Sequence, residues 1–231
     1  MTFRQRILDA INHIEPDGVP VDLGATPSSG ISAIAYDGLK NYLPLKNQRN
    51  WVYDVVQQVT QPSDEVLELF RIDTVDVGRM FDTDDSDWYD YTLLNGSIAQ
   101  QPVWFKPVLR KDGSASVVQN GEVIAVKPSD AFSYDQSVYP FFDGYPAEYN
   151  TALDDDMGRI HWASLAHSPW DHASEADFWT QLRQKAIDLR SKSDRAIVLS
   201  AGCNLFEWGT FMRRIDQFLM DLVDTPAEVE R

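Results

Sequence analysis

Strand-like segments that alternate with helical patterns constrain the fold of this chain more than any other feature. Residues 19–23 are short and nearly all apolar, as a strand covered on both faces should be. Residues 72–77 and 196–202 are two further strand candidates. Because this order of strands and helices is typical of α/β proteins, we expect a sheet of parallel strands.

Helical patterns with recognisable start signals accompany these segments. Residues 2–14 carry apolar side chains at spacings of four, four and three, with Thr2 as the expected N-cap. Residues 63–70 form another predicted helix, with Ser63 as its cap and acids in the first turn, where the helix dipole favours them.

Further helices are expected towards the end of the chain. Ser174 and Asp177 have the spacing of a capping box, and apolar residues from Trp208 to Leu222 recur at spacings of four, three, four and three. Thr225 and Pro226 then resemble the start of a new helix. With three parallel strands predicted, we expect either an open sheet that stops early or a barrel that further protein would complete.

The middle of the chain differs from its surroundings. Residues 82–145 are rich in aspartate, aromatic and turn residues, and Asn120 and Gly121 lie between two β-branched runs. Asn-Gly is the strongest short signal for a β-hairpin, because type I′ turns need positive φ at both central residues. We therefore predict an antiparallel β-hairpin insertion at 82–145 within a single partial domain of residues 1–231.

Charge and cysteine content exclude several classes of partner. The chain has 231 residues and a formal net charge of −16, which repels nucleic acid and anionic membranes. The single cysteine, Cys203, has no partner for an internal disulfide, and the first residues form an amphipathic helical pattern rather than a signal peptide. We expect a cytoplasmic protein with no nucleic-acid or membrane partner.

Three longer segments resemble a known family. FRQRILDAINHIEPDGVPVDLG, FRIDTVDVG and AIVLSAGCNLFEWGTFMRRIDQFLMDLVDTP are similar, in order and spacing, to the amino-terminal half of the uroporphyrinogen decarboxylase superfamily. That superfamily includes porphyrinogen decarboxylases and zinc-dependent methyltransferases that take methyl groups from corrinoids. The resemblance implies an (α/β)8 TIM-barrel fold, incomplete in this chain, with its site at the carboxyl ends of the strands.

The loop after the first predicted strand is the first candidate site. In the decarboxylases this loop carries arginines that bind the carboxylates of the tetrapyrrole, yet residues 25–32 contain no arginine. Thr26, Ser28, Ser29 or the backbone N–H groups would have to contact the substrate instead. Alternatively, these small residues only cap the helix that follows.

The ends of the other two predicted strands supply the remaining substrate-binding candidates. Asp76 is the nearest match to an aspartate that holds pyrrole N–H groups in the decarboxylases, and Arg79 follows it; a surface aspartate paired with Arg79 is the alternative. Cys203 and Asn204 follow the third strand. A lone cysteine is more often a small buried hydrophobe than a nucleophile, and Asn204 also suits a helix cap.

The sequence alone gives no metal site. His161, His167 and His172 are spaced by six and five residues, so no pair shares one face of a helix. The aspartates between residues 82 and 90 lack the glycine and glutamate of a calcium loop, and a solvated acidic loop is the expectation. The resemblance implies that zinc ligands, where present, come from the later half of the barrel, so no cofactor is expected within this chain.

These observations leave several functions open. Because the first loop lacks arginines, we expect a methyltransferase that acts with a corrinoid or a methylated small molecule, with a corrinoid protein as its partner, rather than a true porphyrinogen decarboxylase. Uroporphyrinogen decarboxylase activity in tetrapyrrole biosynthesis is one alternative. The other is a non-catalytic truncated paralogue, a half-barrel that pairs with another chain, including a second copy, through its open edge.

Overall fold

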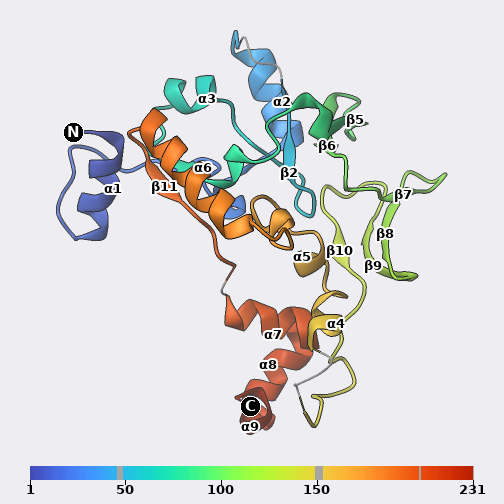
Figure 1. The fold of residues 1–231 in the computed structure, drawn as a ribbon. Helices are drawn as coiled ribbons and strands as arrows, with labels where there is room; N and C mark the ends of the chain where they lie inside the picture. The colour runs from blue at the N-terminus through green and yellow to red at the C-terminus, as the bar shows by residue number, and fades with distance from the viewer. Residues whose placement is uncertain (46–48, 149–152, 203, 231) are drawn as a thin grey trace. The chain divides into compact units, whose positions relative to one another are not determined.

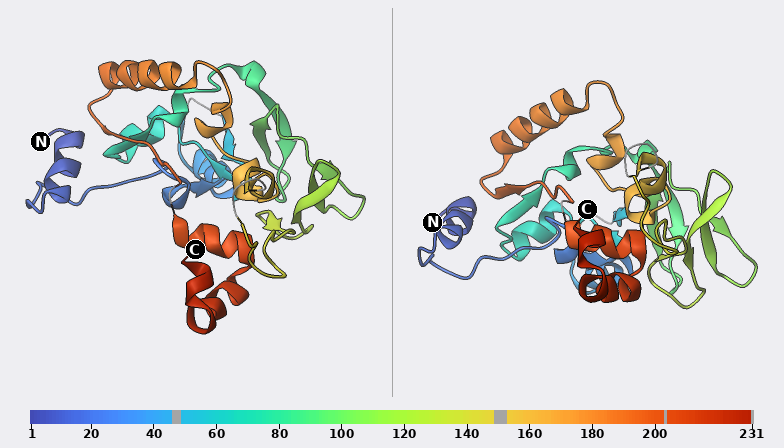
Figure 2. Two further views of the ribbon diagram at one scale, coloured as in Figure 1. Left: turned by 60° about the horizontal axis from the view of Figure 1, so that its bottom comes forward. Right: turned by 90° about the horizontal axis from the view of Figure 1, so that it is seen from below.

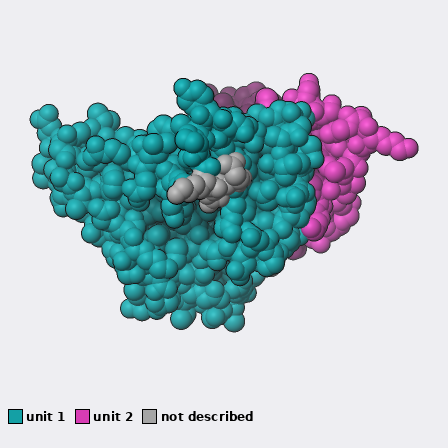
Figure 3. Space-filling model, turned by 90° about the horizontal axis from the view of Figure 1, so that it is seen from above, with its two compact units in different colours: residues 1–105, 166–200 teal, residues 106–165, 201–231 magenta. Residues whose placement is uncertain are grey.

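The computed structural model describes residues 1–45, 49–148, 153–202 and 204–230. The chain forms two compact units, one made of residues 1–105 and 166–200 and the other of residues 106–165 and 201–231 (Figure 3). In the part of the chain that is described, no helix has the length and apolar character needed to span a bilayer.

The first unit mixes helices with short strands (Figure 1). Its helices are α1 (Phe3–Ile11), α2 (Ala33–Tyr42), α3 (Asp64–Leu69) and α6 (Phe178–Lys192), with short 3-10 turns at η1 (Pro27–Ser29), η2 (Gly78–Met80), η3 (Asp85–Asp87) and η4 (Trp170–His172). Its strands are β1 (Ile31–Ser32), β2 (Val52–Asp54), β3 (Val59–Thr60), β4 (Thr74–Asp76), β5 (Trp88–Thr92), β6 (Ile98–Pro102) and β11 (Ala196–Val198).

A parallel pair of strands lies at the centre of this unit. β11 pairs with β4 so that Ala196 lies opposite Thr74 and Val198 lies opposite Asp76. Helices α3 and α6 supply the apolar side chains that bury Val75 of β4, in a cluster completed by Leu67, Ile72 and Leu189. The α/β class is therefore confirmed, whereas no sheet among the described residues closes into a barrel.

The first predicted strand does not form. Residues 19–23 run beside the start of β4, where the backbone N–H of Asp73 donates to the Val21 carbonyl at 2.8 Å. The N–H of Val21 donates instead to the Asp73 carboxylate, also at 2.8 Å, and Arg6 bonds the same carboxylate. The Asp73 side chain thus occupies the Val21 N–H that a second backbone hydrogen bond between the two segments would need. The backbone pairing of residues 19–23 with β4 therefore stops after one hydrogen bond.

Local capping signals predict some helix starts correctly and miss others. Thr2 Oγ1 accepts the N–H of Gln5 at the start of α1, and Ser63 Oγ accepts the N–H of Val66 at the start of α3, as expected. The predicted capping box at Ser174 is wrong, because α6 begins at Phe178, and Asp177 is its N-cap without a side-chain cap bond.

The second unit has an antiparallel sheet and short helices (Figure 2). Its elements are β7 (Val108–Leu109), β8 (Ala115–Gln119), β9 (Glu122–Lys127), β10 (Asp135–Gln136), α4 (Leu153–Met157), α5 (His161–Ser164), α7 (Leu205–Arg213), α8 (Ile215–Asp224) and α9 (Pro226–Val229). The hairpin between β8 and β9 is confirmed: Asn120 and Gly121 form its turn with φ of 50° and 83°.

The single helix predicted from Trp208 to Leu222 is wrong. The chain breaks at Arg214, whose φ is 70°, and α8 folds back against α7. A Cβ on Gly209 would lie 2.3 Å from the Phe218 ring, so only glycine permits this approach. The continuous apolar pattern is therefore shared between two helices that pack on each other.

Candidate functional site

Asp76 lies at the carboxyl end of β4 and is a buried carboxyl group with a strongly raised pKa. The residue is only 6% exposed. Burial raises the pKa of Asp76 to about 7, although a backbone hydrogen bond from Gly78 and the charge of Arg79 act in the opposite direction. A carboxyl group with a pKa near 7 can take up or release a proton at neutral pH.

Two further side chains complete what we name the Asp76 centre, defined as Asp22, Tyr53 and Asp76. The charge of Asp22 also raises the pKa of Asp76, and Thr74 donates its hydroxyl to the Asp22 carboxylate. Tyr53 is 5% exposed, and its hydroxyl has no hydrogen-bond partner among the described residues. Asp22 itself is exposed, so the Asp76 centre reaches the surface there.

The Tyr53 hydroxyl is affected by the same carboxylates. Burial raises its pKa, and the charges of Asp76, Asp54 and Asp22 raise it further, so the phenol stays protonated. The rings of Tyr53 and His167 pack in a T-shaped arrangement, with ring centres 5.4 Å apart and planes at 80°. The centre therefore offers a carboxyl that can exchange a proton and a hydroxyl that is free to donate.

The first loop is arranged around its own turn. Ser29 Oγ lies 3.3 Å from the Thr26 N–H and donates to the Thr26 carbonyl at 3.1 Å, which closes η1. Ser28 is exposed, and Ser32 is the residue that caps α2. These contacts favour a local structural role for Thr26 and Ser29, and substrate binding by the three residues stays a prediction.

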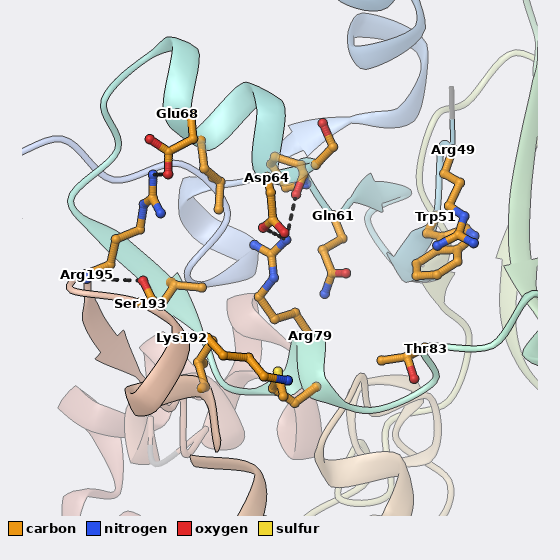
Figure 4. Close-up of a pocket in the computed structure, with 16 residues that line it drawn as sticks. Arg49, Trp51, Gln61, Asp64, Glu68, Arg79, Thr83, Lys192, Ser193 and Arg195 are labelled. Atoms are coloured by element: carbon orange, nitrogen blue, oxygen red, sulfur yellow. Dashed lines mark hydrogen bonds and ion pairs between the residues drawn. The ribbon is translucent and has the colours of Figure 1, made fainter. Parts of the chain in front are cut away.

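Arg79 follows β4 in η2 and pairs with Asp64 rather than with Asp76. Its guanidinium donates to Asp64 Oδ1 at 2.7 Å and extends into a cavity of about 460 Å³ (Figure 4). Val75 lines that cavity and Asp76 does not, because successive side chains of a strand point to opposite faces. Arg79 is therefore ion-paired with Asp64 and not with Asp76, although its charge still lowers the pKa of Asp76.

The Arg79 cavity is bordered by charges that are already paired. Arg195 donates to Glu68 Oε1 at 2.7 Å, and Arg49 lies 2.8 Å from Asp85 Oδ1 and over the Trp51 ring. Arg79 is likewise paired with Asp64, so carboxylates of the protein already neutralise most of the cationic side chains that a ligand in this cavity would meet. The cavity is therefore a weaker candidate site than the Asp76 centre.

The two candidates that follow the third predicted strand are Asn204 and Cys203. Asn204 belongs to the second unit, occupies the N-cap position of α7 and donates its amide to Glu207. Cys203 lies outside the described residues. For both, a role in substrate binding stays a prediction.

The histidines differ in their surroundings. In the second unit His161 is buried, contacts Gln136 through Nδ1 at 3.0 Å and has its pKa lowered to about 4, chiefly by burial. In the first unit His172 lies against Asp82 and Asp171, and the three offer ligand atoms within 4.8 Å of one another. Asp84, Asp85 and Asp90 are exposed, as a solvated acidic loop requires, whereas the side chain of Asp82 is only 16% exposed and departs from that expectation.

Two residues of the Asp76 centre are absent from the sequence predictions. Asp22 follows an apolar run, which is an unusual place for an acid, and this signal could have been used. Tyr53 belongs to β2, which carried no predicted role, and only the tertiary fold brings it to β4. Comparisons with known proteins found no family model, no curated protein and no solved structure that matches this chain.

Proposed function

We propose that this chain carries the ligand-binding and proton-holding part of an enzyme like those of the uroporphyrinogen decarboxylase superfamily, built on a barrel of that type. Asp76 is the observation that carries this proposal. It combines a buried carboxyl, a pKa near 7 and a place at the carboxyl end of a parallel strand, where α/β folds bind their ligands.

The proposed ligand is a tetrapyrrole, a corrinoid or a small methylated molecule. As a carboxylate, Asp76 would accept N–H groups of the ligand; when protonated, it would donate a hydrogen bond or a proton. The Tyr53 hydroxyl would donate a second hydrogen bond, because it has no partner among the described residues. Asp22, exposed at the edge of the centre, would meet the ligand first.

Methyl transfer is the reaction class we favour. The first loop, from Ala25 to Ser29, offers hydroxyls that already bond within η1 and no arginine to hold the carboxylates of a porphyrinogen. The zinc of the superfamily's methyltransferases does not fit the residues of this chain, because a thiolate site needs cysteines and Cys203 is the only one. The proposal therefore assigns to this chain binding and proton holding and no step through zinc.

Porphyrinogen decarboxylation is the second candidate, and Asp76 itself favours it. A buried aspartate at the end of this strand is what the resemblance leads one to expect of an enzyme that holds pyrrole N–H groups. Asp76 and Tyr53 would suit that role equally well, whereas the first loop would not.

An absorbance titration tests the proposal. The purified 231-residue chain is titrated with hydroxocobalamin and, separately, with uroporphyrin, and the spectral change is followed for the chain, for Asp76→Asn and for Asp130→Asn. We expect saturable binding of hydroxocobalamin that is at least tenfold weaker in D76N and unchanged in D130N, whose exposed carboxylate lies in the second unit.

Each other outcome has a definite meaning. Binding of uroporphyrin alone, with the same loss in D76N, would select decarboxylation over methyl transfer. If neither compound binds, or if D76N and D130N bind as the unaltered chain does, the Asp76 centre is not a tetrapyrrole site.

A further inference from the structure

We propose that Asp82, Asp171 and His172 form a binding site for a divalent transition-metal ion, named here the Asp-Asp-His site. Nε2 of His172 lies 3.1 Å from Asp82 Oδ1 and 3.7 Å from Asp171 Oδ1. The three residues come from two segments of the first unit, the stretch after Phe81 and the turn η4, that are about ninety residues apart in sequence. The fold alone brings them together.

Asp171 supplies an independent indication that something is bound. Its side chain is only 10% exposed, and its Oδ1 is buried without a close hydrogen bond among the described residues, although the Trp104 side chain interacts with the carboxylate and lowers its pKa. The same oxygen faces Nε2 of His172. A buried carboxylate oxygen without a close hydrogen bond is unfavourable, because the long contact with His172 replaces only part of its lost hydration, and a metal ion at this point would replace the rest.

The other oxygens and nitrogens are held so that the ligand atoms converge. Ser168 Oγ lies 2.6 Å from Asp82 Oδ2 and 3.1 Å from Asp171 Oδ2, so one hydroxyl orients both carboxylates. Nδ1 of His172 lies 2.7 Å from Glu175 Oε1, which fixes the ring and leaves Nε2 towards the site. Metal-binding histidines commonly have their second nitrogen on a carboxylate in this way.

The ligand set selects the class of metal. Two carboxylates and one imidazole, without a thiolate, suit Mn²⁺ or Zn²⁺ better than Ca²⁺ or Mg²⁺, which prefer oxygen ligands alone. Three protein ligands leave coordination positions for water or for a small anionic ligand. Lys185 bonds the Met80 carbonyl at 2.5 Å and lies over the Phe81 ring, so its ammonium does not neutralise the site directly.

Backbone packing ties the Asp-Asp-His site to the end of β4. The Ser168 carbonyl oxygen would lie 2.3 Å from a Cβ on Gly78, so the segment that carries Asp171 and His172 rests on the backbone that follows Asp76. A bound ion would therefore hold in place the strand end on which the Asp76 centre is built. The metal proposal does not depend on the identity of the ligand of that centre.

Calorimetry on the metal-free chain tests the proposal. The full chain, dialysed against EDTA and then against chelator-free buffer, is titrated with MnCl2 and separately with ZnCl2. We expect one equivalent to bind, with affinity reduced at least tenfold in Asp171→Asn and in His172→Gln. Asp90→Asn is the matched control, because it removes an exposed carboxylate of the same acidic stretch and should bind as the unaltered chain does.

Thermal unfolding gives a second readout with opposite signs. In EDTA, D171N should unfold at the same or a higher temperature than the unaltered chain, because the buried oxygen without a close hydrogen bond no longer carries a charge. With Mn²⁺ or Zn²⁺ the unaltered chain and D90N should be stabilised, and D171N should not. Absence of a one-equivalent site with both metals, or equal losses in D90N and D171N, would overturn the proposal.

Discussion

Replacing Asp76 by asparagine should change how the stability of the protein depends on pH. The pKa of this carboxyl is raised by burial from 3.8 to about 7, so its proton is held about a thousandfold more tightly in the folded state. Three pKa units correspond to about 4 kcal/mol. Because the residue is only 6% exposed, little of this energy is lost to solvent screening.

The sign follows from which state holds the proton. Below pH 4 Asp76 is protonated in both states. Between pH 4 and pH 7 the unfolded chain releases the proton and the folded chain keeps it, so the free energy of unfolding falls as pH rises. The asparagine that D76N introduces does not titrate, and its amide oxygen can still accept the N–H groups of Val77 and Gly78 that bond the carboxylate.

Urea unfolding measured from pH 4 to pH 8 isolates this contribution. All other titrating groups are shared, so the difference in unfolding free energy between D76N and the unaltered chain should increase by about 4 kcal/mol across that range. Tryptophan fluorescence and circular dichroism should give the same midpoints. A difference that changes by less than about 1 kcal/mol would show that Asp76 does not titrate near neutrality, and the Asp76 centre would then have no carboxyl that exchanges a proton at neutral pH.

Three further changes test other parts of the structure. Burial keeps His161 neutral in the folded chain down to about pH 4, whereas the unfolded chain takes up the proton at about pH 6.5, so the free energy of unfolding falls by about 3 kcal/mol as the pH is lowered over this range. In His161→Gln this fall should be absent, and urea unfolding from pH 6.5 to pH 4 measures it. Gly78→Ala should lower the free energy of unfolding by about 1–3 kcal/mol, because its Cβ would meet the Ser168 carbonyl, and an unchanged urea midpoint would refute this packing. Leu182→Ala should lower it by about 2–5 kcal/mol, since Leu182 is buried with Val77, Phe81 and Phe178; a thermal midpoint equal to that of the unaltered chain would contradict the cluster.

Sequence patterns predicted the elements whose signals are local. The caps at Thr2 and Ser63 and the turn at Asn120 and Gly121 depend on a few neighbouring residues, and all form. The strand expected at 19–23 fails because its N–H bonds the Asp73 carboxylate, and a partner about fifty residues away leaves no local trace.

The break at Arg214 shows a second limit of periodicity. Apolar spacing from Trp208 to Leu222 is continuous, and it is equally satisfied by one helix on a sheet or by two helices packed on each other. Gly209 decides between them, because it lets Phe218 approach the backbone of α7. A lone glycine within a helical pattern is too common to have predicted this.

The candidate site was predictable only in part, for the same reason. Asp76 could be chosen because the end of a strand is a local feature. Tyr53, Asp82 and Asp171 reach their sites through tertiary contacts, and His172 was set aside on its spacing to other histidines although its partners are aspartates. Spacing rules describe ligands on one element, whereas these ligands come from several.

Tyr53→Phe separates a functional hydroxyl from a structural one. The hydroxyl is buried and has no partner among the described residues, so its removal should leave the free energy of unfolding unchanged or raise it by about 1 kcal/mol. Tyr89→Phe is the matched control, because the Tyr89 hydroxyl lies 3.0 Å from Gln101 Oε1 and 2.9 Å from the Phe105 carbonyl. Y89F should lose about 1 kcal/mol in urea unfolding.

In ligand binding the two variants should behave the other way round, with Y53F weakened and Y89F unaffected. If the Tyr53 hydroxyl donates to the ligand of the Asp76 centre, Y53F should bind hydroxocobalamin or uroporphyrin about tenfold more weakly, the equivalent of one hydrogen bond, while Y89F binds normally. Equal destabilisation of the two variants would mean that Tyr53 has a structural partner. Unchanged binding by Y53F would place the ligand elsewhere, because removal of a hydroxyl that donates to the ligand must weaken binding.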